Sequence, residues 1–188
     1  MKKPTSVSRR IHSCLQHISE NEHEQALIHF FPALDKTAKK RRPKLNVGAR
    51  FKAFLSDEEG IISLLALNHY IVNVRVDGYT FPEAIYKFGR NCIAHEGELD
   101  PRLNFNNEFG MQIGFNWNLP PSYISALAII VMTAPENENE FIDSPASITL
   151  FDRSFPINDL WGAKDELEKL ILKNFEHYEL IKSMQAPK

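Results

Sequence analysis

The segment that decides the fold is residues 80–95, which read TFPEAIYKFGRNCIAH. Thr80 is of a residue type that caps helices, Pro82 is tolerated in a first helical turn, and Glu83 stands where a capping box requires an acid. Apolar residues then recur at helical spacing, at Ile85, Phe88, Ile93 and Ala94. The segment therefore predicts a helix that carries a short polar motif near its end.

Residues 6–42, which precede this segment, have the apolar spacing of two helices. Asn21 is the predicted break between them, because asparagine caps helices well and Glu24 follows three residues later. Pro32 then lies inside the second helix, and Pro43 ends that helix.

The segment after the motif has a different period. Apolar residues alternate with polar ones at Met111, Ile113, Phe115 and Trp117, the pattern of a half-buried strand. Leu103 and Phe105 form a weaker partner strand across Asn106 and Asn107, so this region predicts a β-hairpin. The other predicted elements are helices over 47–59, 123–133 and 157–183, a compact apolar segment over 61–67, a surface loop over 135–147 and a short strand over 148–151.

Length and composition are those of one folded unit. Chains of roughly 100 to 200 residues usually form one domain, and this chain has 188 residues, of which 43% are hydrophobic and 24% charged. We expect a single domain over residues 1–188 and a mainly α fold, a helical bundle with a small β-hairpin insertion.

Several classes of protein are disfavoured. No apolar stretch follows the cationic N-terminus as a secretory signal requires, and the apolar run from Tyr123 to Met132 is half the ~20 residues of a membrane span. Cys14 and Cys92 form no disulfide framework and no zinc pattern. The histidines are scattered without ligand spacing. We therefore expect a soluble, cytoplasmic protein with no metal and no cofactor.

Arg90, Asn91 and His95 are the candidate catalytic residues, because an arginine, a polar residue and a histidine occur within six positions. A guanidinium binds phosphate oxygens as a planar fork, and an imidazole exchanges protons near neutral pH. This motif resembles the signature of the HEPN family, in which arginine is separated from histidine by four to six residues. The resemblance implies a HEPN-like bundle and a metal-independent endoribonuclease of the toxin or defence type. Its substrate would be RNA, its products a 2′,3′-cyclic phosphate and a 5′-hydroxyl, and its partners a second copy of the chain and an antitoxin protein.

Helical geometry places a condition on this site. Five positions at ~100° each leave the side chains of Arg90 and His95 about 140° apart on one helix. Either the helix ends before His95, which Gly97 permits, or a two-fold dimer brings two copies of the motif together. An ordinary structural interpretation also stands, in which Arg90 pairs with Glu96 or Glu98 and Asn91 caps a helix end.

Other residues support or compete with this site. Lys39, Lys40, Arg41 and Arg42 form a basic run that either holds an RNA backbone or complements the carboxyl end of a helix, and we prefer the second interpretation. Tyr79, Phe81 and Trp117 are candidates for base stacking, although aromatics at this spacing are more often core. Asp35 either orients Arg90 or His95 or pairs with Lys39, the interpretation that we prefer.

Two functions of other classes compete with the ribonuclease. One is a non-catalytic HEPN-like module that binds a nucleotide, RNA or protein through the same surface. The other is a structural dimer with no affinity for phosphate.

Overall fold

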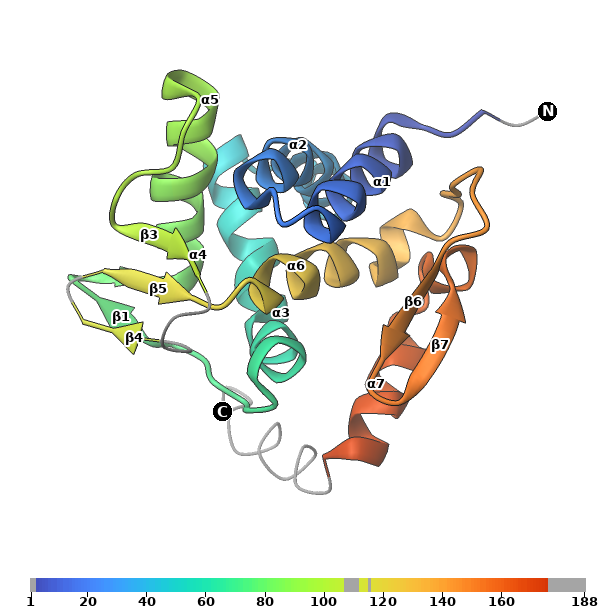
Figure 1. Cartoon of the computed structure of the whole chain (residues 1–188). Helices are drawn as coiled ribbons and strands as arrows, with labels where there is room; N and C mark the ends of the chain where they lie inside the picture. The colour runs from blue at the N-terminus through green and yellow to red at the C-terminus, as the bar shows by residue number, and fades with distance from the viewer. Residues whose placement is uncertain (1–2, 107–111, 115, 176–188) are drawn as a thin grey trace.

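The computed structural model describes residues 3–106, 112–114 and 116–175, and its fold is mainly helical, as predicted. Figure 1 shows α6 in the middle of the molecule, with α1 and α2 on one side and α3 crossing it. The bounds of these helices are α1 Ser6–Ser19, α2 His23–Arg41, α3 Val47–Leu67 and α6 Ser122–Thr133.

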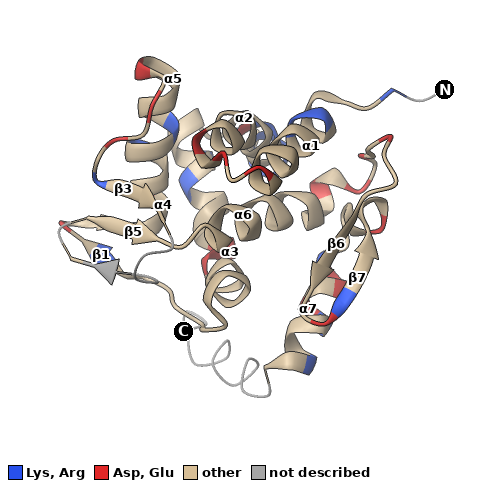
Figure 2. Ribbon diagram, in the orientation of Figure 1, with Lys and Arg blue, Asp and Glu red and all other residues tan. Residues whose placement is uncertain are grey.

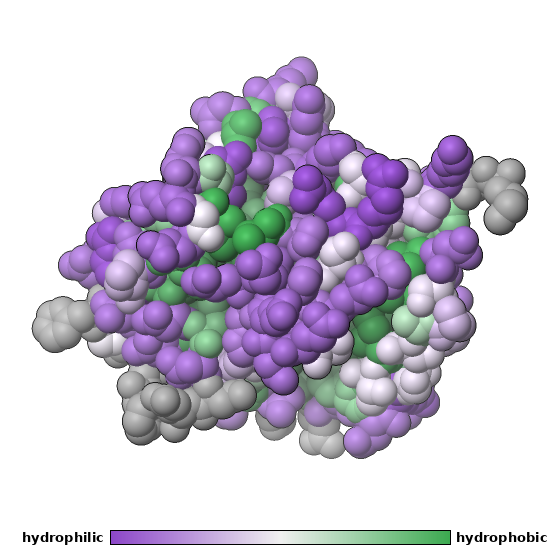
Figure 3. Space-filling view, turned by 45° about the horizontal axis from the view of Figure 1, so that its top comes forward, coloured by the Kyte–Doolittle hydropathy of each residue, from purple (hydrophilic) through white to green (hydrophobic). Residues whose placement is uncertain are grey.

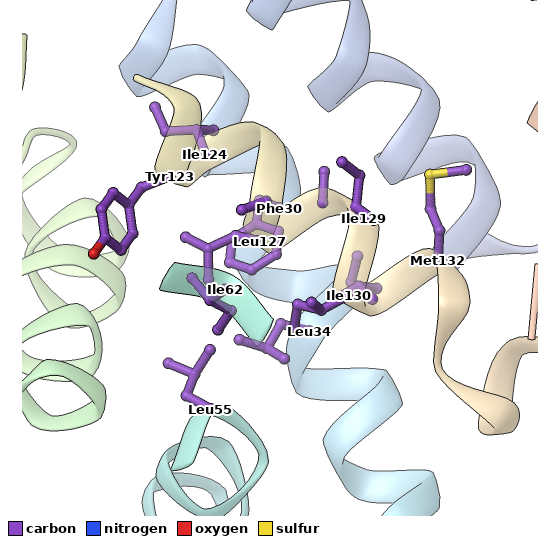
Figure 4. Packing of buried hydrophobic residues seen from close by; sticks show 14 of the residues in the cluster. Phe30, Leu34, Leu55, Ile62, Tyr123, Ile124, Leu127, Ile129, Ile130 and Met132 are labelled. Carbon is purple, nitrogen blue, oxygen red and sulfur yellow. The ribbon is translucent and has the colours of Figure 1, made fainter. Parts of the chain in front are cut away.

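The buried apolar residues form one cluster around α6. Nearly every residue of α6 is buried, which agrees with the unbroken apolar run in its sequence. Figure 4 shows Leu127 and Ile130 of α6 against Phe30 and Leu34 of α2. Ile62 of α3 lies on the same side of α6. The core therefore fixes α2, α3 and α6 relative to one another, and α2 carries one residue of the candidate site.

The predicted break between α1 and α2 is confirmed, but its capping is not. Asn21 has φ 60°, and its N–H donates to the carbonyl of Ile18 at 3.1 Å, so it closes α1. The N-cap of α2 is Glu22, without a side-chain capping bond. Glu24 accepts a hydrogen bond from the N–H of Leu99 at 3.3 Å instead of forming the predicted capping box. Pro32 lies inside α2 as predicted.

The helix α3 is longer than predicted. It continues without a break from Val47 to Leu67, so the predicted helix over 47–59 and the apolar segment over 61–67 are one element. Gly60, at the junction of the two predictions, allows the ring of Tyr70 to pack on the helix, because a Cβ there would lie 2.3 Å from that ring. The sequence pattern missed this continuity because a glycine usually weakens a helix interior.

The motif segment folds as predicted at its start. Glu83 accepts the N–H and the hydroxyl of Thr80, both at 2.9 Å, which forms the expected capping box. The helical stretch consists of α4 Phe81–Ala84, the π-helical turn η1 Ile85–Asn91 and α5 Cys92–Glu96. The π-turn was not predicted, and such turns, with hydrogen bonds from i to i+5, often occur at functional sites.

The β region lies where it was predicted, but its pairing differs. Strands β3 Leu103–Phe105, β4 Gln112–Ile113 and β5 Trp117–Leu119 form a sheet in the order β3-β5-β4. β3 pairs with β5 in parallel, whereas β4 and β5 pair antiparallel. The predicted β-hairpin is present between β4 and β5, but the predicted pairing of 103–105 with 111–117 as its two strands is wrong, because the chain turns within the alternating segment. Met111 and Phe115 lie outside the described residues.

The remaining elements surround this core. β1 Arg75–Val76 and β2 Tyr79–Thr80 form an unpredicted hairpin before α4, and β6 Ser147–Leu150, a predicted strand, pairs with β7 Arg153–Pro156. Two short 3₁₀ turns are η2 Pro135–Asn137 and η3 Ile157–Leu160. The last described helix, α7 Lys164–Asn174, begins later than the predicted residue 157, and residues 176–183 of that prediction lie outside the described chain. No helix among the described residues is long and apolar enough to cross a membrane.

Candidate functional site

The guanidinium of Arg90 is held by groups from two helices. Its Nη2 lies 3.3 Å from Oδ2 of Asp35 on α2, and its Nη1 donates to Oδ1 of Asn91 at 3.1 Å. Its Cζ lies 5.8 Å from the ring centroid of Tyr86, one helical turn before it. The side chain is 25% exposed. Arg90 is thus restrained in position and still open to a ligand.

Gly89 permits this arrangement. A Cβ at Gly89 would lie 2.8 Å from Cζ of Phe31 on α2 and 3.3 Å from Cδ2 of Leu103. Only a residue without a side chain lets η1 approach α2 so closely. That approach brings Arg90 within reach of Asp35.

Asp35 is the partner of Arg90, so the preferred interpretation of Asp35 as a partner of Lys39 is wrong. Glu96 and Glu98, the acids that an ordinary interpretation paired with Arg90, are exposed and make no ion pair with it. Oδ1 of Asp35 is buried and has no hydrogen-bond partner among the described residues. One oxygen of the carboxylate therefore accepts a hydrogen bond from Arg90, and the other accepts none from the described residues.

His95 lies on α5, which projects from the body of the molecule (Figure 1). It is exposed, as are Ala94 and the residues from Glu96 to Glu98. The helix does not end before His95, as one of the two predicted geometries required, because α5 runs to Glu96 and Gly97 follows with φ 86°. Within the described chain no hydrogen bond joins Arg90 to His95. One chain alone does not bring the two side chains together.

The opposite flank of η1 is closed by aromatic and ionic contacts. Lys87 hydrogen-bonds the hydroxyl of Tyr79 and lies 4.4 Å from the centroid of its ring. Arg102 lies 4.2 Å from the centroid of Phe88, and Asp100 binds its guanidinium through two bonds of 2.6 and 2.8 Å. These contacts fix η1 on the side away from Asp35.

Cys92, inside the motif, is not activated. Its Sγ lies 3.4 Å from the carbonyl of Lys87. Burial, and after it the charges of Glu96 and Asp100, raise the pKa of the Cys92 thiol. The thiolate is therefore disfavoured, and a nucleophilic role for this cysteine has no support in its surroundings.

The predicted RNA-binding cations are not equivalent. Arg41 pairs with Glu58 and Glu136, each at 2.7 Å. Burial acts to raise the pKa of Glu136, but the hydrogen bonds and the charge of Arg41 lower it below its ordinary value. Lys40 pairs with Glu140 at 3.2 Å, and Arg42 pairs with Asp57 at 2.8 Å. Lys39 is exposed and makes no ion pair with the described residues. Figure 2 shows Lys and Arg residues mixed with Asp and Glu rather than gathered on one face of this view.

The aromatic candidates divide in a similar way. Phe81 and Trp117 are buried and pack on each other with ring centroids 6.1 Å apart, so they belong to the core and cannot stack on bases. Tyr79 is half-buried under Lys87. Tyr86, which is half-buried beside Arg90, was not among the predicted site residues, although its position four residues before the arginine is visible in the sequence.

One group among the described residues has metal-ligand geometry. The ligand atoms of His17, Glu20 and Glu22 lie within 4.8 Å of one another at the turn between α1 and α2. His17 Nδ1 is 2.6 Å from Glu22 and 3.7 Å from Glu20, and the ring of His29 stacks on that of His17. This group was not predicted from the sequence, because its members are not spaced as a known ligand motif.

The surface near the turn is hollowed. A pocket of about 660 Å³ is lined by Glu22, His23, Glu24, Gln25, Leu99, Pro101, Asn104, Phe105 and Asn106. Figure 3, which brings the top of Figure 1 forward, shows apolar surface in hollows between hydrophilic ridges. This pocket lies at the start of α2, several turns of that helix away from Asp35.

The fold and the site define a mainly helical protein in which an Arg-x4-His motif spans a π-turn and a projecting helix. The chain belongs to the Rv1289 family, whose family model matches residues 6–185. It is 27% identical over 184 residues to "Uncharacterized protein Rv1289" of Mycobacterium tuberculosis, with 88% of each chain covered. "Uncharacterized protein Mb1320" of Mycobacterium bovis matches to the same extent. No solved structure matches the chain.

Proposed function

We propose that this protein is a HEPN-like, metal-independent endoribonuclease that cleaves RNA with Arg90 and His95 in a homodimer. The observation that carries the proposal is the state of Arg90. Asp35 and Asn91 fix its guanidinium, which is 25% exposed, and the exposed His95 follows on the same helical stretch. Phosphoryl chemistry on RNA requires a restrained cation and an accessible imidazole, and the chain offers one of each.

In the proposed reaction RNA supplies the nucleophile. The 2′-hydroxyl oxygen attacks the neighbouring phosphorus, a bond forms between them, and the bond from phosphorus to the 5′-oxygen breaks. One imidazole accepts the proton of the 2′-hydroxyl, and a second donates a proton to the departing 5′-oxygen. Arg90 stabilises the charge that builds on the phosphoryl oxygens. The products are a 2′,3′-cyclic phosphate and a 5′-hydroxyl.

The dimer is part of the proposal for a geometric reason. Arg90 and His95 lie about 140° apart around a regular helix, and α5 continues past His95. Two copies of the stretch from η1 to α5 in a two-fold dimer supply two arginines and two imidazoles, one as the acid and one as the base. A defence or toxin role with an antitoxin partner follows from the same family resemblance.

The test is cleavage of diverse RNAs by the purified protein in chelator. Arg90→Ala should lower the rate on the order of 100-fold to 1000-fold, and His95→Ala on the order of 100-fold or more. His69→Ala is the matched control, because His69 is also exposed but lies outside the motif. Circular dichroism should show that all variants are folded.

A mixing experiment tests the dimer. When wild-type chains are unfolded and refolded with an excess of His95→Ala chains, the activity should fall below the wild-type share of the mixture, because a mixed dimer holds only one of the two imidazoles. Cleavage at the wild-type rate by both single variants would reject the site. A wild type that binds RNA but cuts none would leave a non-catalytic binding module, and one that does neither would leave a structural dimer.

A further inference from the structure

The surface beside Arg90 is formed where η1 meets α2 and the first turns of α3. Asp35 of α2 contacts Arg90, and Phe51 of α3 packs on Tyr86 with ring centroids 5.2 Å apart. A Cβ at Gly48 would lie 3.0 Å from the hydroxyl of Tyr86, so the first turn of α3 lies directly against this ring. Tyr86 is therefore held between two helices while it remains half-buried.

Two cations belong to this junction. Lys39 stands four residues after Asp35, so it shares the face of α2 that carries the partner of Arg90. Arg50 stands seven residues before Asp57 and shares its face of α3, and Asp57 contacts Arg41 of α2. That face of α3 is therefore turned toward the C-terminal half of α2. We name the set Lys39, Arg50, Tyr86 and Arg90 the junction surface.

The two cations differ from their neighbours in charge balance. Lys39 and Arg50 make no ion pair with the part of the chain that the structure describes, and Nε of Arg50 is buried there without a hydrogen-bond partner. Lys40, Arg41 and Arg42, in contrast, are each neutralised by a carboxylate. A phosphate that bound Arg41 would have to displace Glu58, whose side chain is 1% exposed. The junction surface therefore offers positive charge that the run from Lys40 to Arg42 does not.

The other flank of η1, which carries Tyr79 and Arg102, has fewer groups available to bind a ligand. The hydroxyl and one face of Tyr79 are taken by Lys87, and the ring edge packs against Phe88 with centroids 5.0 Å apart. Arg102 is neutralised by Asp100. Tyr86 differs from Tyr79 in that the cation beside its ring is Arg90, a residue of the candidate site, at 5.8 Å from the ring centroid.

We propose that the junction surface holds the single-stranded RNA that flanks the scissile phosphate, with a base on Tyr86 and backbone phosphates at Lys39 and Arg50. This inference rests on the proposed function, and it selects the substrate class. An unpaired base has a free face for an aromatic ring, whereas the bases of a duplex are stacked on one another. The phosphate contacts carry no sequence preference, so the protein would recognise the RNA because it is single-stranded and not by its sequence.

The experiment measures binding without cleavage. A fluorescent single-stranded RNA of mixed sequence is titrated with the folded His95→Ala protein at several salt concentrations. Lys39→Gln and Arg50→Gln should each weaken binding roughly tenfold and lower the slope of log affinity against log salt by about 0.7, the value for one phosphate contact on a single strand. Tyr86→Leu should weaken binding about tenfold without changing that slope.

Lys87→Gln is the matched control, because Lys87 is an exposed lysine on the other flank of η1, without a carboxylate partner among the described residues. It should leave the affinity unchanged. A loss of affinity in Lys87→Gln but not in Lys39→Gln and Arg50→Gln would overturn the inference. Equal or tighter binding of a duplex of the same sequence would also overturn it, as would a protein that binds no RNA.

Cleavage assays separate this inference from the proposed function. If wild type cuts RNA and the Lys39→Gln and Arg50→Gln variants cut it with unchanged KM, the inference fails while the ribonuclease stands. If wild type cuts nothing but binding depends on these residues, the ribonuclease fails while the RNA surface stands.

Discussion

Asp35 of α2 and Arg90 of η1 form an ion pair between residues 55 positions apart in the chain, with Oδ2 and Nη2 separated by 3.3 Å. Both side chains are partly exposed, 19% for Asp35 and 25% for Arg90. A pair at this degree of exposure contributes little to stability. Its main effect is to restrict the directions in which the guanidinium can point.

Asp35→Asn should therefore change activity more than stability. The amide keeps the size of the side chain but loses the charge that holds Arg90, and a misplaced catalytic group can cost on the order of 100-fold in rate. We expect kcat to fall while KM changes little, and the free energy of unfolding to change by less than about 1 kcal/mol. Steady-state kinetics and urea unfolding measure the two quantities. A fall in stability with unchanged kcat would show that Asp35 has only a structural role.

Gly89→Ala tests the close approach that brings the pair together. Alanine normally stabilises a helix interior by about 0.5–1 kcal/mol relative to glycine. At Gly89 the new methyl would meet Phe31 at 2.8 Å, so we expect destabilisation of roughly 1–3 kcal/mol instead, together with a loss of cleavage. Gly114→Ala is the control, because no atom of the described residues lies within 4 Å of its Cβ position.

A second substitution identifies the cause of the effect at Gly89. Phe31→Leu removes the ring that the methyl would meet. In a double-mutant cycle the two changes should therefore cost less together than the sum of their separate costs. Simple additivity would place the strain elsewhere than at Phe31.

The sequence predicted the elements that depend on local chemistry. The capping box of Thr80 and Glu83, the apolar run of α6 and the break near Asn21 are each decided by neighbouring residues. The continuity of α3 through Gly60 was missed because a glycine usually weakens a helix interior, and the ring of Tyr70 that packs on this glycine comes from outside the helix. The parallel pairing of β3 with β5 was missed for a similar reason, since alternation fixes which side chains share a face but not which strand is the partner.

The candidate site was predictable in its residues but not in its contacts. The spacing of Arg90 and His95 is visible in the sequence, and so is the geometric problem that it creates on one helix. The choice of Asp35 as partner depends on how closely η1 approaches α2, which Gly89 sets in three dimensions. The ion pairs of Lys40, Arg41 and Arg42 could not be predicted either. Their carboxylate partners lie far away in the sequence, and a run of basic residues does not show whether its charges are neutralised.

Glu58→Gln tests the buried ion cluster that neutralises Arg41. Glu58 accepts hydrogen bonds from Arg41 at 2.7 Å and from Lys164 of α7 at 2.7 and 2.9 Å, and its side chain is 1% exposed. Removing its charge leaves two cations without their buried partner, which should lower the free energy of unfolding by about 3–5 kcal/mol in urea. Glu166→Gln, at an exposed pair with Lys169, is the control and should have no measurable effect.

Glu59→Gln tests a buried carboxyl group whose pKa is raised by burial. Glu59 is 7% exposed, and burial raises its pKa, although a hydrogen bond from the backbone of Asn73 acts to lower it. The folded protein therefore holds this proton more tightly than the unfolded chain, whose glutamate has a pKa of about 4.3. The stability that this difference contributes is fully present below pH of about 4.3 and is lost as the pH rises through the pKa of the folded state.

The wild type should consequently lose stability relative to Glu59→Gln as the pH rises from about 4 toward neutrality, because glutamine cannot ionise. Urea unfolding at a series of pH values measures the difference. Glu83→Gln is the matched control with the opposite sign, since hydrogen bonds from Thr80 lower the pKa of Glu83, and its contribution is lost as the pH falls. A constant difference between wild type and Glu59→Gln over this range would show that the folded state does not raise the pKa of Glu59.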